Sequence, residues 1–252
     1  MKSFWLALSF LTTIPTPTFP ANEREASGSV RYYPLVGLLL GLLFWGIAVL
    51  VSLFLPTLPT LLSSLLLLTF WVYLTGGLHL DGLMDLADGL GSHRGRDRIL
   101  EIMKDSRVGP MGVIAGILLI FIKTVSIYEV FNGLPLELLI LVPMLARVGL
   151  LFPIYFYPYL TERGMGAGLK QGVTRWLLLL WSFVLFVLTV LLLGFTTMIW
   201  ILLSLAFSAL FIHRVAKKLG GLTGDAYGAY IEVTETLALL LFNIGHAISD
   251  RI

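Results

Sequence analysis

Stretches of about 20 apolar residues, separated by short connections, most constrain how this chain of 252 residues can fold. A helix of that length crosses the hydrocarbon core of a bilayer, because it satisfies its own backbone hydrogen bonds there. The mean hydropathy of +0.93 and the charged fraction of 13% are typical of membrane proteins and not of soluble domains. We therefore predict an all-α integral membrane protein with a bundle of about seven transmembrane helices, near residues 33–55, 58–77, 111–131, 136–157, 176–193, 196–212 and 231–248.

The first apolar segment, residues 4–14, is too short to span a bilayer and precedes Pro15 and Pro17. No small-residue cleavage site follows it, so we expect a retained interfacial or re-entrant helix at the N-terminus. No internal repeat is visible, and we expect one polytopic membrane domain over residues 1–252. The chain has no cysteine, which excludes disulfides and thiolate metal sites.

The basic residues lie on alternate connections along the chain. Connections 56–60, 132–135 and 194–197 have no lysine or arginine, whereas the segments at about 76–110, 158–175 and 213–235 are rich in both. By the positive-inside rule the basic segments are cytoplasmic, so we expect a multi-pass protein of the cell (inner) membrane with its active site on that side. Membrane lipid is therefore an expected partner and nucleic acid is not. The sequence sets no oligomeric state, and a homo-oligomer is compatible with it.

The most informative segment, residues 75–91, has three carboxylates at Asp81, Asp85 and Asp88. On a helix turning about 100° per residue, these positions lie within roughly 60° of one another and share one face. No lysine or arginine lies between residues 76 and 92, so nothing local neutralises the three charges. A divalent cation would, and hard carboxylate oxygens favour magnesium or manganese over zinc.

The pairs Asp81-Gly82 and Asp88-Gly89 also fit turns in a solvated loop, because Asp-Gly is a common turn pair. The apolar residues between the two pairs favour an amphipathic helix instead.

The next segment, residues 92–110, is a predicted surface helix that combines basic and acidic side chains. Its Arg94, Lys104 and Arg107, with Asp105 between the last two, are candidates for binding a phosphate or diphosphate beside the carboxylates. Contact with anionic lipid headgroups explains the basic residues equally well, and the sequence does not separate these two interpretations.

Other polar residues are weaker candidates. Asp225 and Glu232, in the glycine-rich stretch 220–235, either complete the metal site, bind substrate or begin the last helix as acidic caps. His79 is the histidine best placed to touch the site, although a packing role accounts for it too. Lys123 and Arg147 fall inside predicted spans, where each either pairs with an acid or holds a phosphate.

These residues predict a membrane-embedded enzyme that acts on a phosphorylated substrate at the cytoplasmic face. The alternative is a cation-coupled transporter with the three aspartates as its ion site. Transporter carboxylates lie near the bilayer midplane, whereas these follow the end of a span, which favours the enzyme.

The chain resembles the cobalamin synthase family, the adenosylcobinamide-GDP ribazoletransferases. The similar segments are residues 9–17, 32–37, 75–89, 101–109 and 224–229, together with Glu232 and Glu235. The runs Gly-Gly-Leu-His-Leu-Asp-Gly at 76–82 and Lys-Asp-Ser-Arg at 104–107 are specific when they occur together. Met84, Leu86 and Pro110 depart from the smaller or more polar residues expected there, which affects packing more than chemistry.

The resemblance implies transfer of phosphocobinamide from adenosylcobinamide-GDP to α-ribazole or its 5′-phosphate, with release of GMP and a requirement for Mg²⁺. Under this hypothesis Asp81 and Asp85 are the main metal ligands. Asp88 is a third ligand or, like Asp225, a candidate general base. We expect His79 beside them and Arg94, Lys104 and Arg107 on phosphate groups.

The arrangement also resembles that of CDP-alcohol phosphotransferases, lipid enzymes with an aspartate-rich motif at the cytoplasmic end of a helix. That motif has an Ala-Arg pair soon after its first Asp-Gly, and residues 83–88 contain no arginine. The missing arginine makes this family the second choice.

Overall fold

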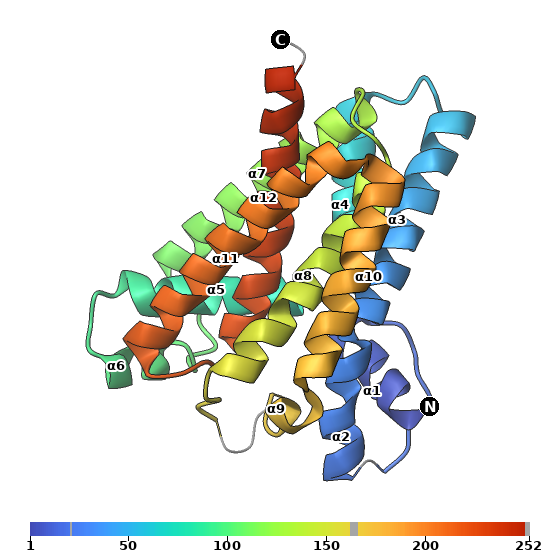
Figure 1. The fold of residues 1–252 in the computed structure, drawn as a ribbon. Helices are drawn as coiled ribbons and strands as arrows, with labels where there is room; N and C mark the ends of the chain where they lie inside the picture. Colours follow the sequence, from blue (N-terminus) through green and yellow to red (C-terminus); the bar gives the residue numbers. More distant parts are fainter. Residues whose placement is uncertain (21, 162–165, 250–252) are drawn as a thin grey trace.

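The computed structural model describes residues 1–20, 22–161 and 166–249, and these residues form helices and connections without a β-strand (Figure 1). The helices are α1 (Lys2–Leu11), α2 (Glu23–Ser29), α3 (Tyr33–Phe54), α4 (Thr60–Leu74), α5 (Leu78–Gly91), α6 (Arg96–Ile102), α7 (Pro110–Phe131), α8 (Leu138–Phe156), α9 (Leu169–Gly172), α10 (Arg175–Leu193), α11 (Met198–Leu219) and α12 (Gly224–Ser249). Short 3₁₀ turns at Val30–Tyr32 and Phe195–Thr197 precede α3 and α11.

Long apolar helices alternate in direction through the bundle. Six described helical segments, containing α3, α7, α8, α10, α11 and α12, are long and apolar enough to cross a membrane, and the count is seven if the bent pair α4–α5 forms one span. The prediction of about seven spans is confirmed. Helix α8 runs through the centre, with 89% of its apolar window buried against 17% in α10.

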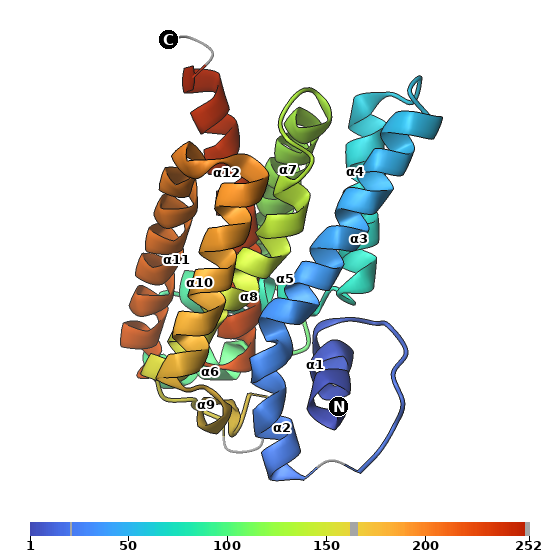
Figure 2. The same cartoon turned by 45° about the vertical axis from the view of Figure 1, so that its right-hand side comes forward.

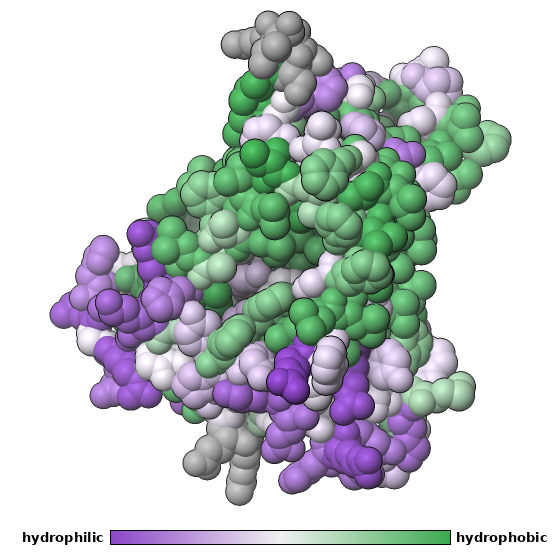
Figure 3. Space-filling model, viewed as in Figure 1, coloured by the Kyte–Doolittle hydropathy of each residue, from purple (hydrophilic) through white to green (hydrophobic). Residues whose placement is uncertain are grey.

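The two ends of the bundle differ in polarity. Helices α1, α2, α6 and α9 lie at one end, and the tip between α3 and α4 and the end of α12 lie at the other (Figures 1 and 2). In Figure 3 apolar residues cover the middle of the visible face, and hydrophilic residues gather at the end with α2, α6 and α9. This polar end carries the basic segments that the sequence places on one side of the bilayer.

Glycines let α3 approach α8 closely. A Cβ atom added at Gly37 would lie 2.6 Å from the carbonyl oxygen of Pro143, and one added at Gly41 would overlap the backbone of Ile140. The two helix backbones therefore touch without an intervening side chain, as expected for small residues at membrane helix interfaces.

The second span differs from the prediction. Helix α4 has only 15 residues, which is about 22 Å at 1.5 Å per residue and less than the roughly 30 Å hydrocarbon core. The chain then bends by 87° into α5. Gly76 and Gly77 have φ angles of +63° and +66°, values that suit glycine. The aspartate segment therefore forms a separate helix lying across the bundle (Figure 1).

The helices at the polar end include residues expected in loops. The N-terminal helix α1 is short and apolar, as predicted, and buries Ala7, Leu8 and Leu11. Helix α12 begins at Gly224 and not near residue 231, so the acidic stretch is helical and only residues 220–223 connect it to α11. The first turns of α12 consequently face α5.

Candidate active site

Helix α5 presents its three aspartates as the sequence predicts, on a helix and not in turns. Leu83 and Leu86 on its other face are buried, while Asp81 is exposed and Asp85 and Asp88 are half-buried. The amphipathic interpretation of this segment is confirmed.

Gly82 brings the start of α12 against α5. A Cβ atom added at Gly82 would lie 2.8 Å from both the Cα atom and the carbonyl oxygen of Asp225. The Asp85 carboxylate is close enough to those of Asp81, Asp225 and Asp88 for their negative charges to repel one another, and so is Asp225 to Asp81. Asp225 therefore joins the aspartates of α5 in one acidic group, an arrangement that depends on the glycine beside Asp81.

Three members of this acidic group lack an internal counter-charge. In the described part of the chain, Asp81, Asp85 and Asp225 form no ion pair. Thr223 donates a long hydrogen bond of 3.4 Å to Asp225. The same described residues contain no cluster of three acidic or histidine side chains spaced to hold a metal ion without other ligands.

Asp88 is held by the first turn of α7. The backbone N–H groups of Gly109 and Gly112 donate hydrogen bonds of 2.6 and 2.7 Å to its two carboxylate oxygens. A carboxylate here satisfies two of the N–H groups that lack partners at a helix start and complements the helix dipole. Asp88 thereby fixes α7 to α5, and its expected roles as ligand or base stay predictions.

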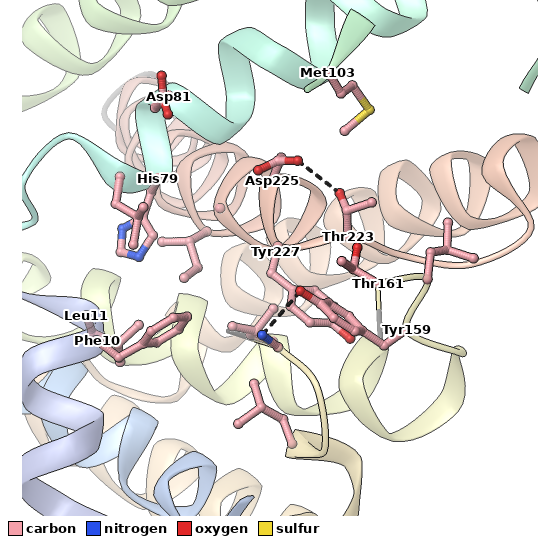
Figure 4. Close-up of a pocket in the computed structure, with 18 of the residues that line it drawn as sticks. Phe10, Leu11, His79, Asp81, Met103, Tyr159, Thr161, Thr223, Asp225 and Tyr227 are labelled. Atoms are coloured by element: carbon pink, nitrogen blue, oxygen red, sulfur yellow. Dashed lines mark hydrogen bonds between the residues drawn. The ribbon is translucent and has the colours of Figure 1, made fainter. Parts of the chain in front are cut away.

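A cavity of about 370 Å³ opens beside Asp81 and Asp225 (Figure 4). Its walls come from α1, α3, α5, α6, α8, α9, α12 and the loop after α8. That loop is fixed to the connection before α12: the Leu160 N–H group donates to the Leu222 carbonyl oxygen, and the Leu222 N–H group donates to the Pro158 carbonyl oxygen, each at 2.9 Å. Of the predicted site residues, the cavity brings together Asp81, Asp225, His79 and Lys104.

His79 lies deep in this cavity wall, with 3% of its surface exposed. Among the described residues neither of its ring nitrogens has a hydrogen-bond partner. Gly228 of α12 packs on it, since a Cβ atom there would lie 3.1 Å from the His79 Cα atom. The structure therefore places His79 at the site but does not give it the satisfied bonds of a packing histidine.

The predicted phosphate-binding residues are only partly assembled. Lys104 is exposed and lines the cavity, whereas Arg94 and Arg107 are exposed and do not. Arg107 donates hydrogen bonds of 3.1 and 2.8 Å to Asp105, and these bonds lower the pKa of the Asp105 carboxyl to about 2. The glycine-rich run 163–170 is a weaker sequence-predicted candidate for binding phosphate, and its Arg163 lies outside the described residues.

Glu232 belongs to a buried charge network deeper in the bundle. Lys123 donates hydrogen bonds of 2.8 Å to Glu232 and 2.6 Å to Glu235, and Arg147 donates to Glu235. All four side chains are at most 5% exposed. The structure thus pairs Lys123 and Arg147 with acids, and it directs Glu232 to Lys123 and away from the cavity.

The aromatic wall of the cavity was not predicted from the sequence. Tyr159 and Tyr227 stack at 5.7 Å between ring centroids, and Phe10 and Tyr33 stack at 5.8 Å. Tyr159 also accepts a hydrogen bond from the Gly166 N–H group. In a chain with 16 phenylalanines and 9 tyrosines, no spacing distinguishes these four from rings that face lipid.

The cavity and the acidic group lie within the part of the chain that matches known proteins. A family model described as cobalamin-5-phosphate synthase matches residues 3–243. The chain belongs to this family. Adenosylcobinamide-GDP ribazoletransferases of Brevibacillus brevis, Desulfitobacterium hafniense and Pseudomonas putida KT2440 are 46%, 40% and 41% identical to it. In the same order, these similarities cover 96%, 95% and 97% of this chain and 97%, 96% and 100% of the relatives. No solved structure matches the chain. The resemblance to cobalamin synthases is confirmed.

Proposed function

We propose that this protein transfers the phosphocobinamide group of adenosylcobinamide-GDP to α-ribazole or its 5′-phosphate and releases GMP. The observation that carries the proposal is the similarity to adenosylcobinamide-GDP ribazoletransferases along nearly the whole chain, at up to 46% identity in the Brevibacillus brevis relative. The similar region includes every residue of the acidic group.

The transfer is a displacement at phosphorus. A ribose hydroxyl of α-ribazole attacks the phosphorus that bears cobinamide, a new P–O bond forms, and the P–O bond to GMP breaks. GMP departs with the bonding electron pair, and the hydroxyl proton passes to a carboxylate. Asp225 is the carboxylate we assign to this proton, because it lines the cavity and forms no ion pair with a described residue.

Mg²⁺ fits the donor set of α5. Asp81 and Asp85 lie one helical turn apart, repel each other and Asp225, and offer hard oxygen ligands. Mg²⁺ in phosphoryl-transfer sites takes one or two carboxylates and completes its shell with water and substrate phosphates, so a closed cage of three protein ligands is not required. When bound, the ion neutralises charge on the diphosphate and on the departing GMP.

The remaining groups position the donor. Lys104 lies at the cavity rim and would bind a diphosphate oxygen, with Arg94 and Arg107 outside it on the same polar surface. We place this surface on the cytoplasmic side of the cell (inner) membrane, since the basic segments gather there.

The test is GMP release by purified protein in detergent or lipid, given adenosylcobinamide-GDP and α-ribazole, with Mg²⁺ or EDTA. We expect Mg²⁺-dependent GMP release with cobalamin formation. Asp85→Asn should lower the rate about 100-fold or more, because it removes charge that holds the metal. The control Asp97→Asn changes a side chain that is 92% exposed on α6 and should stay within about twofold of the parent protein.

Absence of turnover by folded protein, with either acceptor, would contradict the proposal. Full activity of Asp85→Asn or in EDTA would contradict the metal assignment alone.

A further inference from the structure

A groove lies on the outside of the bundle, apart from the active-site cavity. It has a volume of about 450 Å³ and follows one face of α11, with Leu90 from the last turn of α5 on its other side. Among the described residues, none lines both this groove and the cavity. Helix α11 lies at the edge of the bundle in Figure 2, and only 22% of its apolar window is buried. In a membrane the groove therefore faces lipid.

The groove changes from apolar to basic along its length. Phe207 and Leu210, which are 50% and 45% exposed, line it together with Phe211. Arg214 and Lys218 line it one and two helical turns further on, toward the basic end of the bundle. These positions recur every three or four residues, so one face of α11 carries both parts. From Phe207 to Lys218 the helix rises about 16 Å, close to the depth of one leaflet in a hydrocarbon core about 30 Å thick.

The two cations of the groove have no counter-charge on the protein. Arg214 and Lys218 are exposed, and within residues 1–20, 22–161 and 166–249 neither forms an ion pair. Cations near the end of a helix complement its dipole, but that role does not require an apolar groove beside them. Unpaired cations at the edge of the hydrocarbon region attract phosphate, to which arginine donates two parallel hydrogen bonds.

We propose that this groove is a binding site for one anionic phospholipid. The Arg214 guanidinium and the Lys218 ammonium bind the phosphate of its headgroup. One acyl chain lies along Phe207 and Leu210 and packs against Leu90 of α5. The net negative charge of the lipid matters, because a zwitterionic headgroup carries a cation of its own. This inference does not depend on the reaction that the protein catalyses.

Other occupants match only part of the groove. A free phosphate ion fits the two cations but leaves the apolar part uncovered. In a two-fold contact between copies of this chain, the same patch of each copy faces the other. Arg214 and Lys218 would then meet their equivalents and bring four positive charges together. An anionic lipid satisfies both the apolar and the basic part.

The experiment measures lipid binding to the purified full chain by native mass spectrometry from a nonionic detergent. We expect phosphatidylglycerol to bind at least about tenfold more tightly than phosphatidylcholine with the same acyl chains. The double variant Arg214→Gln/Lys218→Gln should bind phosphatidylglycerol about 10- to 30-fold more weakly, because it lacks both cations. Glycerol phosphate, which has the phosphate but no acyl chain, should not displace the lipid.

The matched control is the double variant Arg175→Gln/Lys217→Gln, which removes the same charge. Lys217 precedes Lys218 on α11 and Arg175 begins α10, and both are exposed and do not line the groove. The control should bind phosphatidylglycerol within about twofold of the parent protein. Because all four substituted side chains are exposed, thermal unfolding of both double variants should match that of the parent protein.

Four results would overturn the proposal: unchanged binding in folded Arg214→Gln/Lys218→Gln, an equal loss in the control, equal binding of the two lipids, or displacement of the lipid by glycerol phosphate. The mass spectrum also reports the oligomeric state. A parent protein that is dimeric without bound lipid, and monomeric in Arg214→Gln/Lys218→Gln, would assign the groove to a second copy and overturn the lipid site.

Discussion

At the scale of single residues, the buried charged side chains must be paired with opposite charges, because an unpaired charge inside the bundle is costly. Lys123 and Arg147 face Glu232 and Glu235 inside the bundle, and the Lys123 ammonium also lies 4.8 Å from the centre of the Trp71 ring. Two positive and two negative charges balance there. The sequence places both cations inside spans but does not reveal their partners, because Glu235 follows Arg147 by 88 residues and Lys123 by 112.

Glu235→Gln tests this balance. The change leaves Lys123 and Arg147 with one carboxylate between them among buried side chains, and we expect a loss of about 3–5 kcal/mol in stability. The measurement is the apparent unfolding temperature of the detergent-solubilised protein. Glu129→Gln, on the exposed side of α7, is the control and should unfold like the parent protein.

Equal unfolding temperatures for the two variants would mean that the network contributes nothing to stability.

At the scale of elements, glycines of α5 allow neighbouring helices to pack closely against it. Gly82 admits the backbone of α12, and Gly89 admits Ile99 and Met103 from the α6 segment. The helical period predicts which aspartates share a face, and this part of the site could be derived from the sequence. The crossing of α5 and α12 could not, because it depends on the 87° bend and on a close approach between distant segments.

Gly82→Ala tests the close approach. Its Cβ atom would lie 2.8 Å from the Asp225 Cα atom, so α12 must shift away from α5. A displacement near 1 Å between reacting groups costs about 100-fold in rate, and we expect a fall in GMP release of about 10- to 100-fold. The control is Gly46→Ala on α3, where no atom lies within 4 Å of the added Cβ, and its activity should be unchanged.

Parental activity in Gly82→Ala would show that the separation of α5 and α12 does not set the geometry of the site.

The cavity wall marks the limit of prediction from the sequence. Phe10, Tyr33, Tyr159 and Tyr227 come from four separate segments, and each ring resembles many others in an apolar chain. Only the folded bundle distinguishes rings that line a cavity from rings that face lipid.

At the scale of the whole molecule, apolar length and charge placement account for most of the topology. Six long helices and the bent pair agree with the predicted spans, because the bilayer demands a fixed apolar length. The broken second span escaped prediction, since the apolar run hides where α4 ends and Gly76-Gly77 redirect the chain.

Labelling of single cysteines tests the orientation cleanly, because the chain has no cysteine of its own. In inside-out membrane vesicles an impermeant maleimide should react with Ser106→Cys, on the basic side, and not with Thr57→Cys between α3 and α4. In intact spheroplasts the pattern should reverse. Both positions are exposed. Labelling of Thr57→Cys and not of Ser106→Cys in the inside-out vesicles would invert the proposed topology.

The charge network also imposes an order on biosynthesis. The two cations belong to α7 and α8, whereas both acids belong to α12, which leaves the ribosome after them. Until α12 inserts, the nascent bundle holds two unmatched positive charges inside the lipid bilayer. A chain that ends before α12 therefore keeps unpaired positive charges at Lys123 and Arg147. When α12 packs into the bundle, its glutamates pair with these cations and its first turn places Asp225 beside the aspartates of α5.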